Sequence, residues 1–399
     1  MAAGTSVRVS SDSLPRSKAR VNHRRLGNYA NRVSPAGQTG DLQARRRLSR
    51  RRRSRLRHQL RGLTTLPRLA DCGAKTVTGF GGPILRVSGT DEERMAGYAG
   101  LVTCGSCWAC PTCAAKIAAR RSEELSQVMR TVLIAGGSAS LITLTMRHHA
   151  GHRLKDLWRA LSAAWRGVIS GKQWMADQEL GGLLGWVRVV EATHGRNGWH
   201  LHVHVLVCWQ RSVSLELAQD IGHRMWQRWS RVLERKGFTS WKHRGGVDVR
   251  MATLRTDNLA HYFNKLAREV TSAHTKESRG GRSPFKILTD GLQTGDCQDL
   301  DVWGEWEQAS FGRRQLTWSL GEHDLRKLAD LGSEQSDEEI AEEDLAGEDT
   351  IALPHLTWEA LLQGELTTDL LDAAEIAGVE GACTFLTMRS LDWVSVGAK

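Results

Sequence analysis

The chain has 399 residues, of which 40% are hydrophobic, so it can form two or three compact units with a sizeable core. The sequence contains no run of about 18 apolar residues, so it predicts no membrane span. The arginine- and serine-rich start lacks the apolar segment of a secretory signal. Eight cysteines in such a chain indicate thiols or metal ligands rather than a disulfide framework.

Charge is distributed unevenly along the chain. Residues 1–62 carry 17 basic residues against two aspartates, a net charge of +15, whereas residues 331–399 carry 16 acidic against two basic residues, a net charge of −14. Because the whole chain carries +11, the middle keeps +10. A basic body with a more basic arm favours binding to a polyanion such as DNA. The alternative is a solvated arm without a specific role.

The first 65 residues lack hydrophobic periodicity and contain a dense arginine run. We expect residues 1–65 to be a disordered basic arm, with helix formation at most on DNA. Its predicted DNA contacts are Arg50, Arg51, Arg52 and Arg53.

Five of the eight cysteines fall within residues 66–121, which predicts a small metal-binding unit. Structural zinc takes four ligands in a tetrahedron, and one short CxxCxxCxxC segment cannot easily wrap four thiolates around one ion. An iron–sulfur cluster and reduced core cysteines are the alternatives. The zinc ligands that we expect are Cys72, Cys104, Cys110 and Cys113, with Cys107 spare or as an alternative.

In residues 122–276, predicted helices alternate with predicted strands, and the first helix spans about 121–133. This order predicts an α+β fold built on an antiparallel sheet flanked by helices. We expect residues 277–330 to be an accessory segment packing on this domain, and residues 331–399 to be an acidic, solvated tail with two short helices in 355–396. The elements in order are a strand at 138–146, a helix at 154–170, a hairpin of 185–193 and 199–207, a helix at 214–236, a strand at 245–252 and a helix at 258–273.

Three histidines alternate along the second hairpin strand: His200, His202 and His204. Side chains on a strand alternate faces, so all three point the same way. If 195–198 form the turn, Glu191 lies opposite His202 on that face. A carboxylate beside imidazoles is suited to Mg²⁺ or Mn²⁺. The alternative is three histidines on an exposed face, and a register slip would break the pairing.

The predicted helix at 258–273 carries Tyr262, one of only three tyrosines, with Lys265 three residues later. Positions i and i+3 share a helix face, so phenol and ammonium project together. A tyrosine that attacks a phosphodiester gains from a nearby cation and a metal ion. The alternative is a core tyrosine with a solvated lysine.

In these motifs the chain resembles the rolling-circle plasmid replication initiators, a branch of the HUH endonucleases, and especially those of actinobacterial plasmids. The resemblance covers roughly residues 70–340. It rests on three segments in the family's order: SLITLTMRH at 140–148, WHLHVHVLV at 199–207 and YFNK at 262–265. Blocks at 104–117, 283–288 and 303–319 are also similar to family segments.

The resemblance implies an HUH-type sheet with Tyr262 as nucleophile and Lys265 as its positioning cation. His202 and His204 are implied metal ligands, Glu191 a third, and His200 a possible substitute. The implied reaction nicks one strand at a plasmid origin, leaves a 5′-phosphotyrosine and a free 3′-hydroxyl, and later religates.

The resemblance further implies that the protein binds single-stranded or cruciform origin DNA, with Arg147 among the contacts, and that it works with a host helicase and polymerase. It also implies no membrane partner and a cytoplasmic location in a bacterium. A glutamate expected near Asn258 is absent, which leaves termination open; Asp257 is a candidate base. The alternatives are an HUH transposase or relaxase, and a non-catalytic zinc-containing DNA-binding protein.

Overall fold

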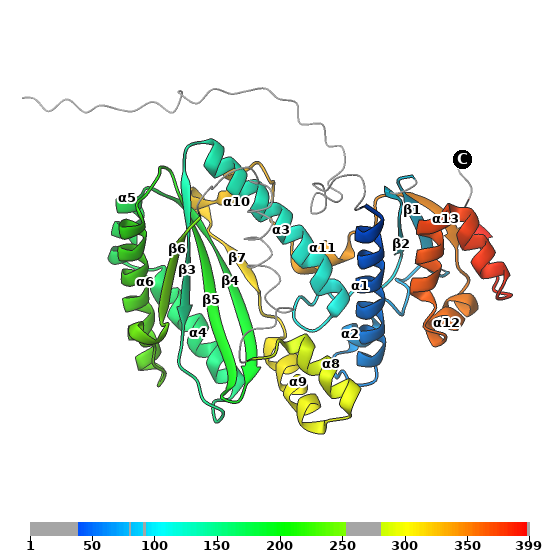
Figure 1. The fold of residues 1–399 in the computed structure, drawn as a ribbon, viewed down its shortest axis with the longest axis horizontal. Coiled ribbons are helices and arrows are strands. Elements are labelled where there is room, and N and C mark those ends of the chain that lie inside the picture. Colours follow the sequence, from blue (N-terminus) through cyan, green and yellow to red (C-terminus); the bar gives the residue numbers. More distant parts are fainter. Residues whose placement is uncertain (1–38, 80, 91–92, 253–280, 397–399) are drawn as a thin grey trace, which may run out of the picture.

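Two antiparallel β-sheets organise the chain (Figure 1). The computed structural model describes residues 39–79, 81–90, 93–252 and 281–396. The larger sheet has five strands in the order β6-β3-β5-β4-β7, so its centre is the predicted hairpin with the predicted first strand beside it. Its strands are β3 (Ser138–Thr145), β4 (Leu183–Gly195), β5 (Gly198–Trp209), β6 (Val247–Met251) and β7 (Leu316–Trp318).

Helices cover both faces of the larger sheet. One face, which includes Leu201, Val203 and Val205, packs into a core with α4 (Leu154–Val168) and α6 (Leu215–Arg235). Helix α4 buries residues at i, i+3, i+4 and i+7, the spacing of an amphipathic helix. The other face packs at one end on α3 (Pro111–Ile134), which contributes Leu125, Val128, Met129 and Val132.

The smaller sheet has the order β2-β1-β8-β9 and joins segments from both ends of the described chain. A separate core beneath it includes Leu85, Ile351, Trp358 and Leu370. The elements of this part are β1 (Ile84–Ser88), β2 (Met95–Ala99), β8 (Glu348–Ala352), β9 (Val394–Ser395), α12 (His355–Gln363) and α13 (Thr367–Thr387).

The remaining elements lie around or between the two sheets. Helices α8 and α9 lie at one end of the larger sheet (Figure 1), where Trp306 stacks on Trp199 and meets Trp108 edge-on. These remaining elements are α1 (Thr39–Leu60), α2 (Pro67–Asp71), α5 (Lys172–Gly181), η3 (Lys242–Arg244), α8 (Pro284–Thr294), α9 (Cys297–Ser310), η5 (Gly321–His323), α10 (Leu325–Leu328) and α11 (Asp337–Glu342).

The α+β class and the antiparallel sheet are confirmed, but the expected disordered arm and solvated tail need correction. Residues 39–60 of the arm form helix α1, and the tail forms β8, β9 and three helices. The two segments contact each other through ion pairs between α1 and α13. The segment 277–330 is also more than accessory, because its β7 is an edge strand of the larger sheet.

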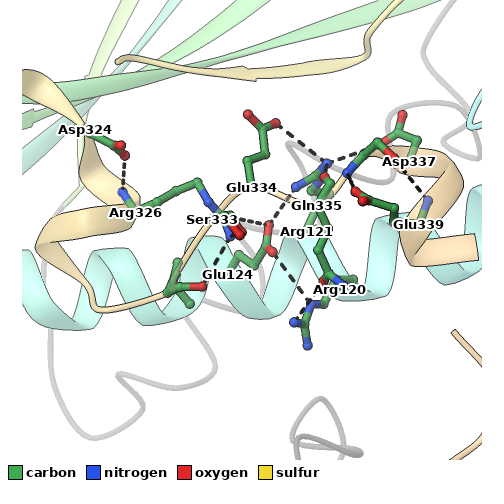
Figure 2. Close-up of polar contacts among 12 residues, drawn as sticks. Arg120, Arg121, Glu124, Asp324, Arg326, Ser333, Glu334, Gln335, Asp337 and Glu339 are labelled. Atoms are coloured by element: carbon green, nitrogen blue, oxygen red, sulfur yellow. Dashed lines mark hydrogen bonds and ion pairs between the residues drawn. The ribbon is translucent and has the colours of Figure 1, made fainter. Parts of the chain in front are cut away.

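A network of buried charges fastens the start of the acidic segment to α3 (Figure 2). Arg121 pairs with Glu124 at 3.0 Å and with Asp337 at 3.3 Å, and Arg326 pairs with Glu124 at 2.9 Å. The side chains of Arg121, Glu124 and Arg326 are at most 6% exposed. Because losing one partner of a buried ion pair leaves an uncompensated charge, this network holds the two segments together.

Within the described residues, no helix has the length and apolar composition needed to cross a bilayer.

Candidate metal centre and nucleic-acid interface

The hairpin has the register predicted from its turn. Gly195 pairs with Gly198, and Glu191 pairs with His202. Gly198 has φ 78°, a left-handed conformation that glycine adopts without strain. One carboxylate oxygen of Glu191 lies 3.1 Å from Nε2 of His202 and 2.8 Å from Nε2 of His204. The structure therefore gathers the three predicted ligands at one point.

This cluster lies on the face of the sheet that α3 covers at its other end. Leu206 and Cys208 continue the same face of β5 and are buried in the core with α3. Towards the hairpin turn the face becomes polar. The side chain of Glu191 is 10% exposed, that of His202 12% and that of His204 18%. The site is thus a largely buried polar patch at the edge of an apolar layer.

Hydrogen bonds decide the protonation of the carboxylate. Burial alone would raise the pKa of Glu191, but the hydrogen bonds and charges of His202 and His204 outweigh it and hold that pKa well below its usual value. Nδ1 of His204 lies 3.0 Å from the hydroxyl of Thr143 on β3, which orients the ring. Glu191 is therefore anionic, and Nε2 of His204 is turned towards its carboxylate.

The geometry fits a metal ion with nitrogen and oxygen ligands. For bonds of about 2.1 Å at right angles, ligand atoms lie about 3 Å apart, close to the 2.8 and 3.1 Å found here. Glu191, His202 and His204 form one of two groups among the described residues that could hold a metal. His200, the possible substitute, is not part of this group.

His200 instead contacts His148, which follows β3. Their Nδ1 atoms are 3.1 Å apart. Burial, followed by the proximity of His202 and His148, lowers the pKa of His200 to about 3. We did not single out His148 from the sequence, although it ends the SLITLTMRH segment. Its signal was weak because it lies beyond the strand.

The second group that could hold a metal consists of four cysteines. Sγ of Cys72 lies 3.7 Å from Sγ of Cys110 and 3.6 Å from Sγ of Cys113, and Sγ of Cys104 lies 3.7 Å from that of Cys113. Tetrahedral thiolates at 2.3 Å from zinc would be about 3.8 Å apart. The set is the one expected from the sequence, with Cys107 buried outside it.

Local structure explains why these thiols converge. Cys110 is the N-cap of α3, and its sulfur accepts a hydrogen bond from the backbone N–H of Cys113, with Pro111 as first helical residue. A helix N-terminus favours thiolates. Hydrogen bonds with Cys104, Cys110 and Cys113 hold the pKa of Cys72 well below its usual value.

The predicted nucleophile Tyr262 and its partner Lys265 lie outside the described residues, as does Asp257. The geometry between the phenol and the Glu191 cluster therefore stays a prediction.

The predicted DNA-contacting arginines lie in different environments. Arg50 is enclosed by Asp372 and Glu375 of α13, and Arg51 pairs with Asp372 and with Asp369. Arg50 is therefore not a free phosphate contact in this conformation, because carboxylates of its own chain surround it.

Arg52 is exposed, and Arg53 is half-buried and donates a hydrogen bond to Ser49 at 2.6 Å. Arg147 is exposed and lies over the ring of Trp241 at 4.4 Å.

Comparison with known proteins gives the family. A family model described as "Replication protein" matches residues 100–360. "Protein rep" of Streptomyces lividans is 31% identical over 351 residues, which cover 69% of this chain and 76% of that protein. A "Neomycin resistance protein" of Streptomyces cyanogenus is 35% identical over 133 residues, which cover 27% of this chain and 30% of that protein. No solved structure matches the chain. The chain therefore belongs to the replication protein family, as its resemblance to replication initiators predicted.

Proposed function

We propose that this chain is a plasmid replication initiator that nicks one DNA strand at its origin through Tyr262. The observation that carries the proposal is the gathering of Glu191, His202 and His204 on one hairpin, in a chain of the replication protein family. We take the five-stranded sheet to be of the HUH type. The carboxylate and imidazole groups of Glu191, His202 and His204 suit Mg²⁺ or Mn²⁺.

In the proposed reaction the phenol oxygen of Tyr262 forms a bond to the scissile phosphorus and the bond to the 3′-oxygen breaks. The phenol proton passes to a base or to solvent, and the 3′-oxygen takes up a proton. A divalent ion held by Glu191, His202 and His204 would polarise the phosphate. Lys265 offsets negative charge on the phosphate. The free 3′-hydroxyl primes a polymerase, a host helicase opens the duplex, and the reverse transesterification closes the strand.

The test is incubation of the full chain with supercoiled plasmid carrying its origin, in Mn²⁺ or Mg²⁺. We expect nicked or relaxed plasmid and a nucleotide covalently attached to Tyr262, located by mass spectrometry. Tyr262→Phe should lose both. The matched control is Tyr98→Phe, because Tyr98 is a partly buried residue of the smaller sheet whose hydroxyl donates to the carbonyl of Thr367 at 2.7 Å.

Other outcomes separate the alternatives. Adduct formation in Tyr262→Phe would rule out the assigned nucleophile. Metal and DNA binding without nicking on the origin would favour a non-catalytic DNA-binding protein. Strand transfer between two DNA molecules, without dependence on a plasmid origin, would favour a transposase or relaxase.

We also propose that the four-cysteine cluster holds structural zinc. The sulfur spacing of 3.6–3.7 Å supports it. Cys110→Ser should lose about one zinc per chain by elemental analysis and destabilise the region around α2 and the start of α3. Cys107→Ser, which changes a buried thiol outside the cluster, should keep it. Equal zinc content in both variants, or iron in the purified protein, would contradict this assignment.

A further inference from the structure

One tryptophan faces solvent beside the proposed site. Trp241, in the loop between α6 and β6, is 45% exposed, whereas most tryptophans among the described residues are buried. The guanidinium of Arg147 lies 4.4 Å from its ring centroid and that of Arg244 lies 5.4 Å away. An exposed indole with two guanidinium groups beside it combines an apolar ring with positive charge.

The loop that carries Trp241 is held firmly to the sheet. The hydroxyl of Thr145 donates to the carbonyl of Gly245 at 2.7 Å, and the hydroxyl of Ser240 donates to the carbonyl of Thr145 at 2.7 Å. A Cβ on Gly246 would come within 2.7 Å of the Trp241 carbonyl, so the backbone turns tightly here. The exposure of Trp241 therefore comes from a braced loop.

Strand β3 places this loop next to the metal-compatible cluster. Thr145 pairs with His202 across β3 and β5. Thr143 contacts His204 on the cluster's face of the sheet, and Thr145, two residues on, shares that face. Opposed residues in such a pair lie about 5 Å apart. The loop therefore joins the sheet one strand away from a proposed metal ligand.

The charge around Trp241 is positive. Lys242, His243 and Arg244 follow it directly, and all are exposed. Among the described residues, the side chains of Arg147 and Arg244 have no ion pair with a carboxylate. Proteins that hold single-stranded DNA combine aromatic faces for the bases with cations for the phosphates.

We propose that Trp241, with Arg147 and Arg244, is a stacking platform for an unpaired DNA base next to the strand that is cut. The inference rests on the proposed nicking function for its biological role. Binding to the platform needs neither metal nor Tyr262. In this arrangement the indole stacks on the base, and the two guanidinium groups contact the neighbouring phosphates.

The experiment compares two fluorescent probes with the full chain in EDTA: a 20-nucleotide oligothymidine, and an abasic strand of equal length and charge. Trp241→Ala should weaken binding of oligothymidine roughly 5- to 100-fold, the effect of losing one stacked base, and leave the abasic strand unchanged. Trp241→Phe should recover much of the affinity. Arg147→Gln should weaken binding of both probes. It should also lower the slope of log affinity against log salt by the amount expected for about one phosphate contact.

The control is Phe311→Ala, which removes an aromatic residue that is 70% exposed at the end of α9. It should bind both probes like the unchanged protein. The proposal is overturned if Trp241→Ala binds oligothymidine normally, or if it loses both probes equally. Thermal unfolding of each variant checks the fold, and the Phe variant distinguishes lost stacking from a disturbed loop. Absence of nicking on an origin plasmid would defeat the proposed function but not this result.

Discussion

The hairpin and the pair of charged helices α1 and α13 both bring complementary groups together, but over very different chain separations. Glu191 meets His202 and His204 across 11 and 13 residues. Arg50 meets Glu375 across 325 residues. Strand alternation and turn length predict the first contact, whereas only the complete fold determines the second.

The helix pair forms a row of ion pairs. Nη2 of Arg46 lies 3.1 Å from Glu375, Nη1 of Arg50 lies 2.6 Å from the same carboxylate, and Nε of Arg51 lies 2.6 Å from Asp372. Helix α1 has nine arginines, and like charges at i and i+4 destabilise a helix. The carboxylates of α13 supply the counter-charges that we expected from DNA phosphates.

The largest effect should come from breaking this row. The double change Asp372→Asn with Glu375→Gln leaves the guanidinium of Arg50, which is 19% exposed, without its carboxylates. We expect the free energy of unfolding to fall by about 3–5 kcal/mol, as for a half-removed buried pair. Urea unfolding measures this. Glu359→Gln, which touches only an exposed pair with His355, is the control and should change little. Equal stability of both variants would mean that the row is not structural.

In the hairpin, we expect the carboxylate of Glu191 to be needed for binding of a divalent metal ion. Glu191→Gln should weaken binding of Mn²⁺ by roughly 10- to 100-fold or more, because losing even a residue that only hydrogen-bonds to a metal ligand weakens binding by that much. The variant should keep its fold. Calorimetric titration and circular dichroism check the two parts. Thr193→Val, on the same face of β4, is the matched change and should bind normally. Unchanged affinity in Glu191→Gln would exclude this carboxylate as a ligand.

The dependence of stability on pH tests the environment of His200, which contacts His148. The pKa of His200 is about 3 in the fold, below the unfolded value of about 6.5. The unfolded chain therefore takes up this proton first, and stability falls as pH drops below 6.5. From pH 6.5 to 5.5 the loss should be about 1 kcal/mol, and His200→Gln should abolish that part. An unchanged pH profile in His200→Gln would contradict this prediction.

The smallest effect should appear in DNA binding by α1. Arg52 is exposed outside the row, whereas Arg51 is already paired with Asp369 and Asp372. Arg52→Gln should reduce the slope of log affinity against log salt for a duplex by about 0.9, and Arg51→Gln by less. Equal reductions would show that DNA displaces α13 from the arginines.

The sequence predicts well where local rules apply. Alternation put His200, His202 and His204 on one face, the turn length set the pairing of Glu191 with His202, and the cysteine spacing indicated which four sulfurs converge. Helix boundaries were less accurate. Helix α3 begins at Pro111, ten residues before the predicted start at 121, because residues 111–120 are grouped with the cysteine-rich unit in the prediction although their alanines favour a helix.

The sequence by itself determined the basic start, the acidic end, the α+β order and the residues of both metal-compatible clusters, because each depends on composition or on neighbours along one element. The tertiary structure decided that the two charged ends meet, that β1 pairs with β8, and that Trp241 stands exposed beside β3. These contacts join segments hundreds of residues apart or depend on which surface remains uncovered, and no local periodicity records either.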